Sequence, residues 1–391
     1  MKILFVTAKY YPDGAGAGRS VRNLAQIVTV KGHEAVVVRL TPNKEKIVET
    51  ISGVKIYHLP LRNIYWPSTK KRNVIQKLCW HVIDAFNPLA MKDLARILKA
   101  EQPDIVNTNI IAGFSAGIFY TIKKAGIPLV HTMRDYYLLS TNSGLFRNGK
   151  PIRHIYCLNP FVITRRLSAR NVDLFLANSA HVLDRHKDAG LINECQQSCV
   201  QFNMNEDDYI TKPKLSNKNT HRFGFIGRVD PTKGLEVLLQ ATQTITDKEF
   251  SLRIAGDGNQ DYIEQLKKQY PDPRIQFIGF TEADKFYEQI HTLICPSIYE
   301  EPLPRVVYEA YAKALPVIVS DAGGTPEIVE LGKTGLIYPA TDAYVLAENM
   351  IRIIDDVALY KNLSKGAAQK AELFTKTKVT DDYLLKVREC L

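Results

Sequence analysis

The sequence predicts an α/β protein with two doubly wound parallel-sheet domains, and three observations lead to this prediction. The chain has 391 residues, which is long for one hydrophobic core and comfortable for two. Short apolar runs alternate with helical patterns almost throughout. Between positions 203 and 221 the sequence is polar, contains proline and is poor in large aliphatic residues, as a domain linker is.

The apolar runs are typical of β-strands that are buried on both faces. Such strands belong to parallel sheets covered by helices. The runs are 3–7, 35–40, 54–59, 104–109, 128–133 and 174–179 in the first half, and 223–227, 252–256, 275–279, 292–297, 316–320 and 335–338 in the second. Two facing domains of this kind predict a ligand cleft between the carboxyl ends of their strands.

Composition excludes several classes of protein. Apolar residues make up 45% of the chain, yet no hydrophobic run approaches the ~20 residues that span a bilayer. The start, MKILFVTAKYYP, reads as a buried strand rather than a signal peptide, because it is short and has no small-residue cleavage site. The six cysteines show no C-x-x-C spacing. We therefore expect a cytoplasmic protein with reduced thiols and no metal site.

Charge is divided unevenly between the two halves. Residues 1–205 carry 28 Lys and Arg against 13 Asp and Glu, whereas residues 206–391 carry 23 against 28. The formal net charge of +10 therefore comes from the N-terminal half alone. A basic surface suits nucleic acid, an anionic membrane surface or an anionic substrate. Because no nucleic-acid recognition motif accompanies the charge, we expect no nucleic-acid partner.

The first strand leads into a glycine-rich loop, YYPDGAGAGRSV. A dinucleotide fingerprint fails here, because Arg19 stands where its last glycine belongs and Arg39 stands where a ribose-binding acid belongs. We therefore expect no nicotinamide cofactor. Gly14 and Gly16 remain candidates for a close backbone approach to a phosphate or sugar. A tight strand-to-helix turn explains any single glycine equally well.

In the second half, FGFIGRVDPTKG places two cations after a strand. The strand ends at Gly227, and Arg228 and Lys233 flank a proline turn before the next helix. Arginine offers a bidentate fork and lysine a point charge, which together suit a diphosphate. A solvated basic turn is the alternative reading.

Two further strands end in residues that suit a nucleotide. LRIAGDGN ends in a glycine turn with Gly256 and Asp257. IQFIGF ends in Phe280, where a base can stack.

The stretch YEEPLPRVVYEA contains two glutamates, Glu301 and Glu309, eight positions apart. Pro304 suits the first turn of a helix, so Glu301 precedes that helix and Glu309 lies within it. Eight residues of helix rise roughly 12 Å and rotate about 80° beyond two full turns, so the two acids cannot share one proton or one metal. They can contact the two ends of one long ligand across the helix N-terminus. The alternative is a solvated acid and a helix-cap acid.

Together these stretches resemble glycosyltransferase family 4, retaining enzymes of the GT-B fold. The most specific block is 296–339, and the first half resembles the family more weakly through its glycine loop, PDIVNTN, VHTMRDYYLL and LANSAHV. The family's E-x7-E motif falls on Glu301 and Glu309. The resemblance implies that Glu301 lies beside the donor sugar and that Glu309 binds the nucleotide ribose. Arg228 and Lys233 would then close over the leaving diphosphate.

The chain departs from the family pattern at two places. The usual Glu-Gly-Phe-Gly is here Glu301 followed by Pro-Leu-Pro, so backbone recognition must come from Leu303 and Arg305 around Pro304. The family often has His-Asp where positions 134–135 are Arg-Asp. The resemblance therefore places Arg134 and Asp135 on the acceptor or sugar side. The resemblance implies a UDP- or GDP-sugar donor. Because no D-x-D triplet occurs and the two cations can replace its metal, we expect no metal and no other cofactor.

The resemblance implies a cytoplasmic transferase that acts on a lipid-linked or polysaccharide acceptor in bacterial cell-surface glycan synthesis. We expect an N-terminal acceptor-binding domain over 1–205 and a nucleotide-sugar-binding domain over 206–370. A C-terminal helix within 371–391 is expected to return to the N-terminal domain. The alternatives are a non-catalytic sugar-nucleotide-binding partner subunit and another GT-B enzyme such as an epimerase.

Residues 65–86 predict a helix that docks on an anionic membrane surface at the inner face of the cell membrane. The segment contains both tryptophans of the chain. Its apolar residues fall near one helical stripe, namely Val74, Ile75, Leu78, Val82, Ile83 and Phe86, and its basic residues gather at one end, namely Lys70, Lys71, Arg72 and Lys77. Stripe, tryptophan and basic flank suit an interfacial helix. An ordinary amphipathic helix that covers the N-terminal sheet is the alternative.

Overall fold

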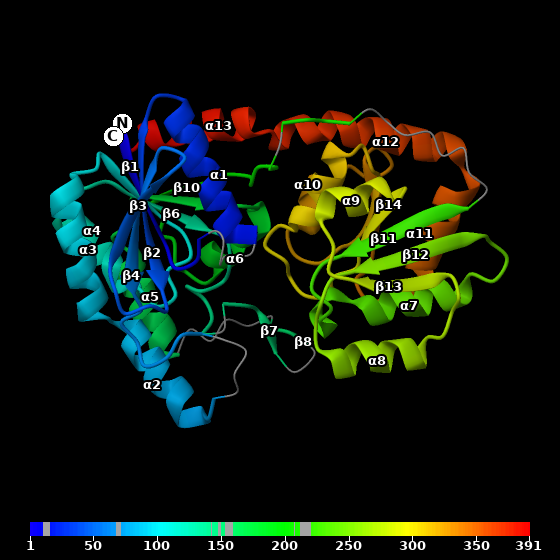
Figure 1. Cartoon of the computed structure of the whole chain (residues 1–391), viewed down its shortest axis with the longest axis horizontal. Helices are drawn as coiled ribbons and strands as arrows, with labels where there is room; N and C mark the ends of the chain where they lie inside the picture. Colours follow the sequence, from blue (N-terminus) through cyan, green and yellow to red (C-terminus); the bar gives the residue numbers. More distant parts are fainter. Residues whose placement is uncertain are drawn as a thin grey trace. The chain divides into compact units, whose positions relative to one another are not determined.

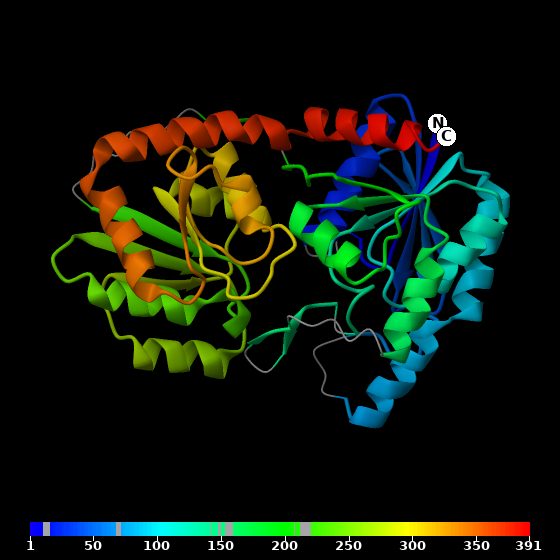
Figure 2. The same cartoon turned by 180° about the vertical axis from the view of Figure 1, so that it is seen from behind.

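The structure is a computed structural model of the whole chain and describes residues 1–10, 16–67, 72–141, 143–147, 150–152, 159–206, 208–211 and 220–391. The chain divides into two compact units. Unit 1 comprises Met1–Leu145, Arg153–Glu206 and Lys376–Leu391, and unit 2 comprises Phe146–Ile152 and Asp207–Thr375. Figures 1 and 2 show helices around the sheet of each unit. The predicted fold class, two parallel-sheet α/β domains, is confirmed.

Unit 1 contains an eight-stranded sheet in the order β10-β9-β6-β5-β1-β2-β4-β3. In that order the strands are Gln197–Val200, Leu174–Ala177, Leu129–Met133, Ile105–Thr108, Lys2–Thr7, Glu34–Thr41, Val54–Pro60 and Ile47–Ile51. All neighbours pair in parallel except β3 and β4. The prediction omitted β3 and β10, because every residue of β3 is exposed and β10 is only half-buried. Edge strands of this kind lack the continuous apolar run that marks a central strand.

The helices of unit 1 surround this sheet. They are α1 (Gly16–Val30), α2 (Val74–Ala85), α3 (Pro88–Glu101), α4 (Gly117–Lys124), α5 (Pro160–Ala169), α6 (Ala180–Asp188) and α13 (Lys376–Arg388). The last helix, α13, packs against α1, and Figure 1 shows the two side by side. Its Val379, Tyr383 and Val387 join the same hydrophobic cluster as Phe5 of β1. The C-terminal segment is therefore part of the core of unit 1.

Unit 2 contains a six-stranded, wholly parallel sheet in the order β13-β12-β11-β14-β15-β16. In that order the strands are Ile275–Gly279, Phe250–Ala255, His221–Ile226, Thr292–Cys295, Val317–Ser320 and Gly335–Tyr338. Its helices are α7 (Leu235–Thr244), α8 (Gln260–Gln269), α9 (Ala283–Glu288), α10 (Arg305–Ala312), α11 (Ala343–Asp355) and α12 (Val357–Ala371), with short 3₁₀ turns η1 (Pro231–Lys233), η2 (Thr325–Ile328) and η3 (Glu372–Phe374).

Unit 2 also holds a small hairpin that the sequence did not predict. Strands β7 (Phe146–Arg147) and β8 (Lys150–Pro151) pair antiparallel, and the segment Phe146–Ile152 is assigned to unit 2 although the chain on both sides belongs to unit 1. The ring of Phe146 lies edge-on to that of Tyr299, with centroids 6.4 Å apart. A two-residue strand carries no hydrophobic periodicity, so only the tertiary contact reveals it.

Candidate active site

The predicted donor residues of unit 2 follow four adjacent strands at one edge of the sheet. Asp257 follows β12, Phe280 follows β13, Arg228 follows β11 and Glu301 lies in the loop after β14. In a parallel sheet the carboxyl ends of all strands lie at the same edge, which is where open α/β sheets bind ligands. The fold therefore gathers residues that are 73 positions apart in sequence, from 228 to 301, along one edge.

The centre of this edge is an ion pair between Lys233 and Glu301. The Lys233 Nζ lies 2.6 Å from Glu301 Oε1, and the Ser297 hydroxyl donates a hydrogen bond to the same oxygen. Glu301 is almost fully buried. Burial lowers the pKa of Lys233, because it favours the neutral amine. The nearby Glu301 carboxylate has the larger total effect, so the pKa of Lys233 is raised. Lys233 is therefore a fixed positive charge at neutral pH.

Two close backbone approaches hold this pair in place. Gly234, directly after Lys233, has φ of 68°, and a Cβ there would lie 1.8 Å from the Pro296 carbonyl oxygen. Gly323 has φ of 64°, and a Cβ there would lie 2.4 Å from the Glu301 carbonyl oxygen, which accepts a 2.8 Å hydrogen bond from Gly324 N–H. Only glycine fits both the space and the dihedral angle. The AGG segment at 322–324 thus positions the backbone of Glu301.

Arg228 differs from Lys233 in its surroundings. Its side chain is 69% exposed and its Nε lies 3.8 Å from Asp230 Oδ2. Asp230 in turn caps η1, because its carboxylate accepts from the Thr232 backbone N–H at 3.0 Å. The Arg228 charge is therefore weakly held and accessible, whereas Lys233 is 22% exposed and tightly paired.

Glu309 occupies α10 as the sequence predicts, with two partners that the sequence did not reveal. Arg305 donates to Glu309 Oε1 from Nε at 3.1 Å, and the Tyr287 hydroxyl donates to Oε2 at 3.0 Å. Burial, and then the Glu309 charge, raise the pKa of Tyr287 well above its ordinary value, so it stays a donor. Helix α10 begins at Arg305, and its N-cap residue, Pro304, supplies no side-chain hydrogen bond to the first turn.

The remaining donor candidates are placed as follows. The Gly227 N–H donates to the Ala255 carbonyl, and the Gly256 N–H donates to the Gly279 carbonyl, so the three loops are tied together by their backbones. The Phe280 ring is 78% exposed, which leaves a face for stacking. Leu303 is buried, so only its backbone is a candidate for ligand contact.

In unit 1 the acceptor-side candidates lie after β6. Arg134 donates from Nε to Asn109 Oδ1 at 3.0 Å and from a terminal nitrogen to Asn203 Oδ1. The three residues follow β6, β5 and β10, so they lie along the carboxyl edge of the sheet. Gly16 is the first residue of α1, and Gly14 lies outside the described residues. The two asparagines were missed: Asn109 ends the PDIVNTN stretch but nothing in the sequence gave it a role, and Asn203 lies outside the quoted stretches.

Asp135 is the titratable group of this loop. Its carboxylate accepts from the Tyr137 N–H at 2.9 Å. Burial raises the pKa of Asp135 to about 6, against the lowering effects of that hydrogen bond and of Arg165 and Lys9. Burial therefore moves the titration of this carboxyl toward neutral pH.

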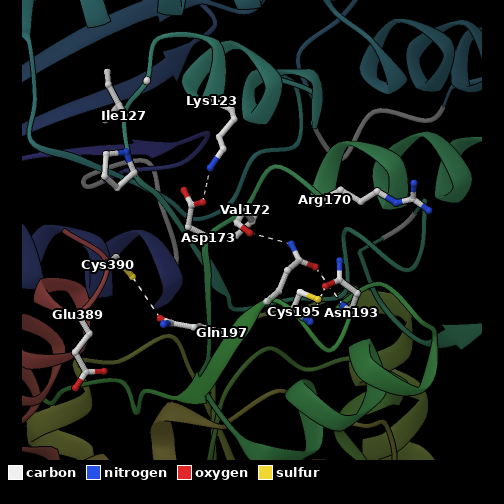
Figure 3. A pocket seen from close by; sticks show the side chains of 13 residues that line it. Lys123, Ile127, Arg170, Val172, Asp173, Asn193, Cys195, Gln197, Glu389 and Cys390 are labelled. Carbon is white, nitrogen blue, oxygen red and sulfur yellow. Dashed lines mark hydrogen bonds and ion pairs between the residues drawn. The ribbon is translucent and has the colours of Figure 1, made fainter.

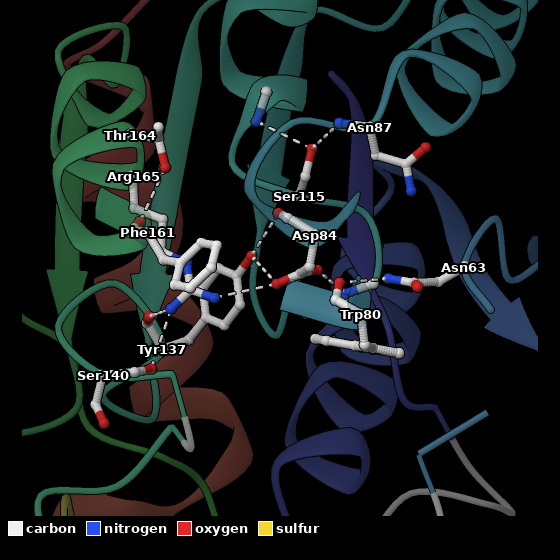
Figure 4. Close-up of polar contacts among 12 residues, drawn as sticks. Asn63, Trp80, Asp84, Asn87, Ser115, Tyr137, Ser140, Phe161, Thr164 and Arg165 are labelled. Carbon is white, nitrogen blue, oxygen red and sulfur yellow. Dashed lines mark hydrogen bonds and ion pairs between the residues drawn. The ribbon is translucent and has the colours of Figure 1, made fainter. Parts of the chain in front are cut away.

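A buried polar network fixes the loop that carries Arg134 and Asp135 (Figure 4). The Arg165 guanidinium donates to the Tyr137 and Ser140 carbonyls and lies 3.1 Å from Asp84 Oδ2. The Tyr137 hydroxyl donates to the same Asp84 oxygen at 2.7 Å, and the Gly113 N–H donates to the other at 2.6 Å. Asp84 and Arg165 are completely buried. The network thus joins α2 and α5 to the loop after β6.

A pocket of about 640 Å³ lies at the opposite edge of the unit 1 sheet (Figure 3). Its lining includes Pro128, Asp173 and Gln196, which directly precede β6, β9 and β10. These are the amino ends of the strands. None of the sequence-predicted site residues lines this pocket, so it is separate from the candidate active site.

Two chemical features of the described residues bear on cofactors and membranes. Among them no group of three or more His, Cys, Asp and Glu side chains is arranged to hold a metal ion. Within the same part of the chain, no helix has the length and apolarity that crossing a bilayer requires.

The fold and the edge-of-sheet site define a glycosyltransferase of the GT-B class. The family described as Glycosyl transferases group 1 matches residues 207–370, and that described as Glycosyltransferase Family 4 matches residues 14–195. An uncharacterised 42.6 kDa protein in the cps region of Klebsiella pneumoniae is 31% identical over 331 residues, which are 84% of this chain and 87% of that protein. The chain belongs to glycosyltransferase family 4.

Two further similarities agree with this assignment. An uncharacterised glycosyltransferase of Methanocaldococcus jannaschii is 37% identical over 362 residues, which are 87% of this chain and 85% of that protein. The crystal structure of HepE from Anabaena in complex with UDP has a TM-score of 0.75 at 20% identity and covers 100% of both chains. The second similarity shows the GT-B fold.

Proposed function

We propose that this enzyme transfers a sugar from a UDP- or GDP-sugar to an acceptor hydroxyl with retention of configuration at the anomeric carbon. The observation that carries the proposal is the pairing of Lys233 with Glu301 at the carboxyl edge of the unit 2 sheet. Support also comes from HepE, a protein of similar fold solved with UDP. Unit 2 binds the donor, and unit 1 binds the acceptor.

The donor lies across the N-terminus of α10 in this proposal. Glu301 contacts the sugar, Glu309 the ribose and Phe280 the base, while Lys233 and Arg228 contact the diphosphate. The bond from the anomeric carbon to the diphosphate oxygen breaks, a bond to the acceptor oxygen forms on the same face, and the acceptor proton leaves on the diphosphate. Preorganised positive charge stabilises the anion that develops, and this term is commonly the largest in such reactions.

The two cations replace the metal ion in this mechanism. A lysine ammonium and an arginine guanidinium supply the charge that a divalent cation supplies elsewhere. Added EDTA is therefore expected to leave turnover unchanged. Inhibition by EDTA that magnesium reverses would contradict the metal-free mechanism.

Thermal shift with UDP, GDP and ADP, and with their common sugars, tests the donor assignment. A ligand above its dissociation constant raises the apparent melting temperature by mass action. We expect UDP or GDP, and the matching sugar nucleotide, to stabilise the chain. An enzyme that none of these compounds stabilises would contradict the proposal.

The acceptor, in our proposal, is lipid-linked or a growing polysaccharide, and α2 holds unit 1 on the anionic inner face of the membrane. Val74, Ile75, Leu78 and Val82 of α2 are all exposed, as is Phe86 directly after it. The stripe therefore does not cover the sheet of unit 1, which was the alternative reading. An exposed apolar stripe on a helix suits a membrane interface.

The sequence predicted tryptophans that anchor this segment at the membrane interface, and for Trp80 this prediction was wrong. Trp80 is only 7% exposed and its indole N–H donates to the Tyr65 carbonyl at 3.1 Å. It lies on the face of α2 that packs toward the protein, so it is not an interfacial anchor. Lys77 is exposed on α2 and Arg72 stacks on the Tyr65 ring, whereas Lys70 and Lys71 lie outside the described residues.

A further inference from the structure

A second pocket, of about 440 Å³, opens beside α2 in unit 1. It lies where α2 gives way to α3 and where the chain leaves β4. Six apolar side chains line it, namely Leu61, Val82, Ile83, Phe86, Pro88 and Leu89. Three of them, Val82, Phe86 and Leu89, are 56%, 57% and 60% exposed. The apolar lining is thus continuous with the exposed stripe of α2.

This pocket lies at the carboxyl edge of the unit 1 sheet. Leu61 directly follows β4, and its N–H donates to the carbonyl of Thr41, the last residue of β2, at 3.1 Å. Arg134 follows β6 at the same edge, four strand positions away in the order β6-β5-β1-β2-β4. At about 4.8 Å per strand the separation is roughly 19 Å. An extended molecule along this edge can therefore reach both places.

Positive charge flanks the pocket. Arg62, which lines it, lies with Nε 2.9 Å from Asp93 Oδ2. Lys46 and Arg96 contact the other oxygen of Asp93, at 2.7 and 3.4 Å. Asp93 is buried, and its single charge faces three cations. The cluster therefore keeps a positive excess of two, which attracts an anion.

An apolar pocket with a cationic edge fits an amphiphile that has a hydrocarbon chain and an anionic head. A protein partner would satisfy the apolar stripe, but it would not by itself account for the cationic cluster beside the pocket. A free phosphate would satisfy the cations and leave the six apolar side chains unexplained. Hydrocarbon in the pocket gains the transfer free energy of its methylene groups.

We propose that this pocket binds the hydrocarbon chain of a lipid-phosphate-linked acceptor, with the phosphate on Arg62 and its neighbours. The acceptor sugar then extends along the sheet edge toward Arg134. This inference rests on the proposed function and deepens it, because it names the acceptor as a lipid phosphate rather than a free polysaccharide.

Calorimetric titration of the full chain with decyl phosphate, below its micelle-forming concentration, tests the proposal. Decanol and inorganic phosphate are the single-feature probes. We expect decyl phosphate to bind at least tenfold more tightly than either, because it alone offers both chain and charge. Arg62→Gln should lower the affinity for decyl phosphate to nearly that for decanol. Equal binding of decyl phosphate and decanol by the native chain would overturn the phosphate contact.

Two matched double variants test where the hydrocarbon chain binds. Val82→Ser with Leu89→Ser alters the pocket, and Ile75→Ser with Leu78→Ser alters exposed residues of α2 outside it. We expect the first pair to weaken decyl phosphate binding about tenfold or more and the second pair to leave it unchanged. All four residues are more than half exposed, so both pairs should fold. An equal loss in both pairs would overturn the pocket assignment.

Two outcomes separate this inference from the proposed function. If UDP stabilises the protein but decyl phosphate does not bind, the pocket assignment is refuted and the donor assignment stands. If decyl phosphate binds but no nucleotide stabilises the protein, the pocket assignment is supported and the donor assignment is refuted. A short-chain phosphatidylglycerol that binds as tightly as decyl phosphate would identify a bilayer-lipid site and overturn the acceptor assignment.

Discussion

The Lys233 ammonium and the Glu301 carboxylate lie 2.6 Å apart although 68 positions separate the two residues in the chain. The loops after β11 and β14, which are neighbouring strands, bring them together. Glu301 therefore balances the positive charge of Lys233, which we assign to the donor diphosphate. Donor binding has to share or replace this pair, so each residue has a measurable role of its own.

Lys233→Ala should lower turnover by about 10² or more, because a preorganised charge beside the developing anion is lost. Arg228→Ala should have an effect of the same order. Urea unfolding must accompany the kinetics, since loss of Lys233 leaves the buried Glu301 without its positively charged partner. Lys285→Ala, which removes an exposed lysine of α9, is the control and should be silent. Near-normal turnover in both site variants, with folding intact, would refute the diphosphate assignment.

Glu309→Ala should weaken nucleotide binding about tenfold or more and change turnover at saturating donor much less. Contacts to the ribose are uniform between the ground state and the transition state, so their loss appears in affinity. Titration with UDP and GDP measures the effect, and Glu348→Ala, an exposed acid of α11, is the control. Unchanged affinity would show that Glu309 serves only its contacts with Arg305 and Tyr287.

Asp135→Asn should stabilise the chain at pH 8 and have little effect near pH 4. The pKa of Asp135 is raised from 3.8 to about 6 in the folded protein, so the folded state binds this proton more tightly than the unfolded state. The stability it contributes is fully present below pH 3.8 and is lost as the pH rises through 6. The loss amounts to up to about 3 kcal/mol, and asparagine avoids it.

Urea unfolding at pH 4, 6 and 8 measures this difference. Asp184→Asn, which neutralises an exposed carboxylate on α6, is the matched control. A constant difference between Asp135→Asn and the native chain at all three pH values would show that Asp135 does not titrate in this range.

Ile75→Ser with Leu78→Ser should reduce sedimentation with anionic liposomes. The native chain should bind anionic liposomes more than neutral ones, and high salt should weaken that binding, because each basic residue near the surface contributes about 1 kcal/mol of screened attraction. Leu385→Ser removes an exposed leucine of α13 instead and should have no effect. Equal and negligible sedimentation with both kinds of liposome would contradict the proposal that α2 binds a membrane.

Much of the fold was determined by local sequence. Twelve strands were predictable because each is a short, largely apolar run, and burial of the central strands on both faces requires such a run. The same logic placed Arg228, Asp257 and Phe280 after strands, and Pro304 placed Glu301 just before a helix. Because parallel strands share a carboxyl edge, the sequence predicted a ligand cleft at that edge.

Only the tertiary structure decided which side chains pair and which faces are covered. Neither Ser297 nor Tyr287 stands out in sequence, yet each donates to a glutamate of the site. The periodicity of α2 did not determine whether its apolar stripe packs on the sheet. It also did not reveal that Trp80 lies on the buried face of the helix, away from that stripe. Strand β3 and the hairpin at 146–152 were likewise invisible. A local pattern reports how polar a residue is, but burial and pairing depend on segments distant in the chain.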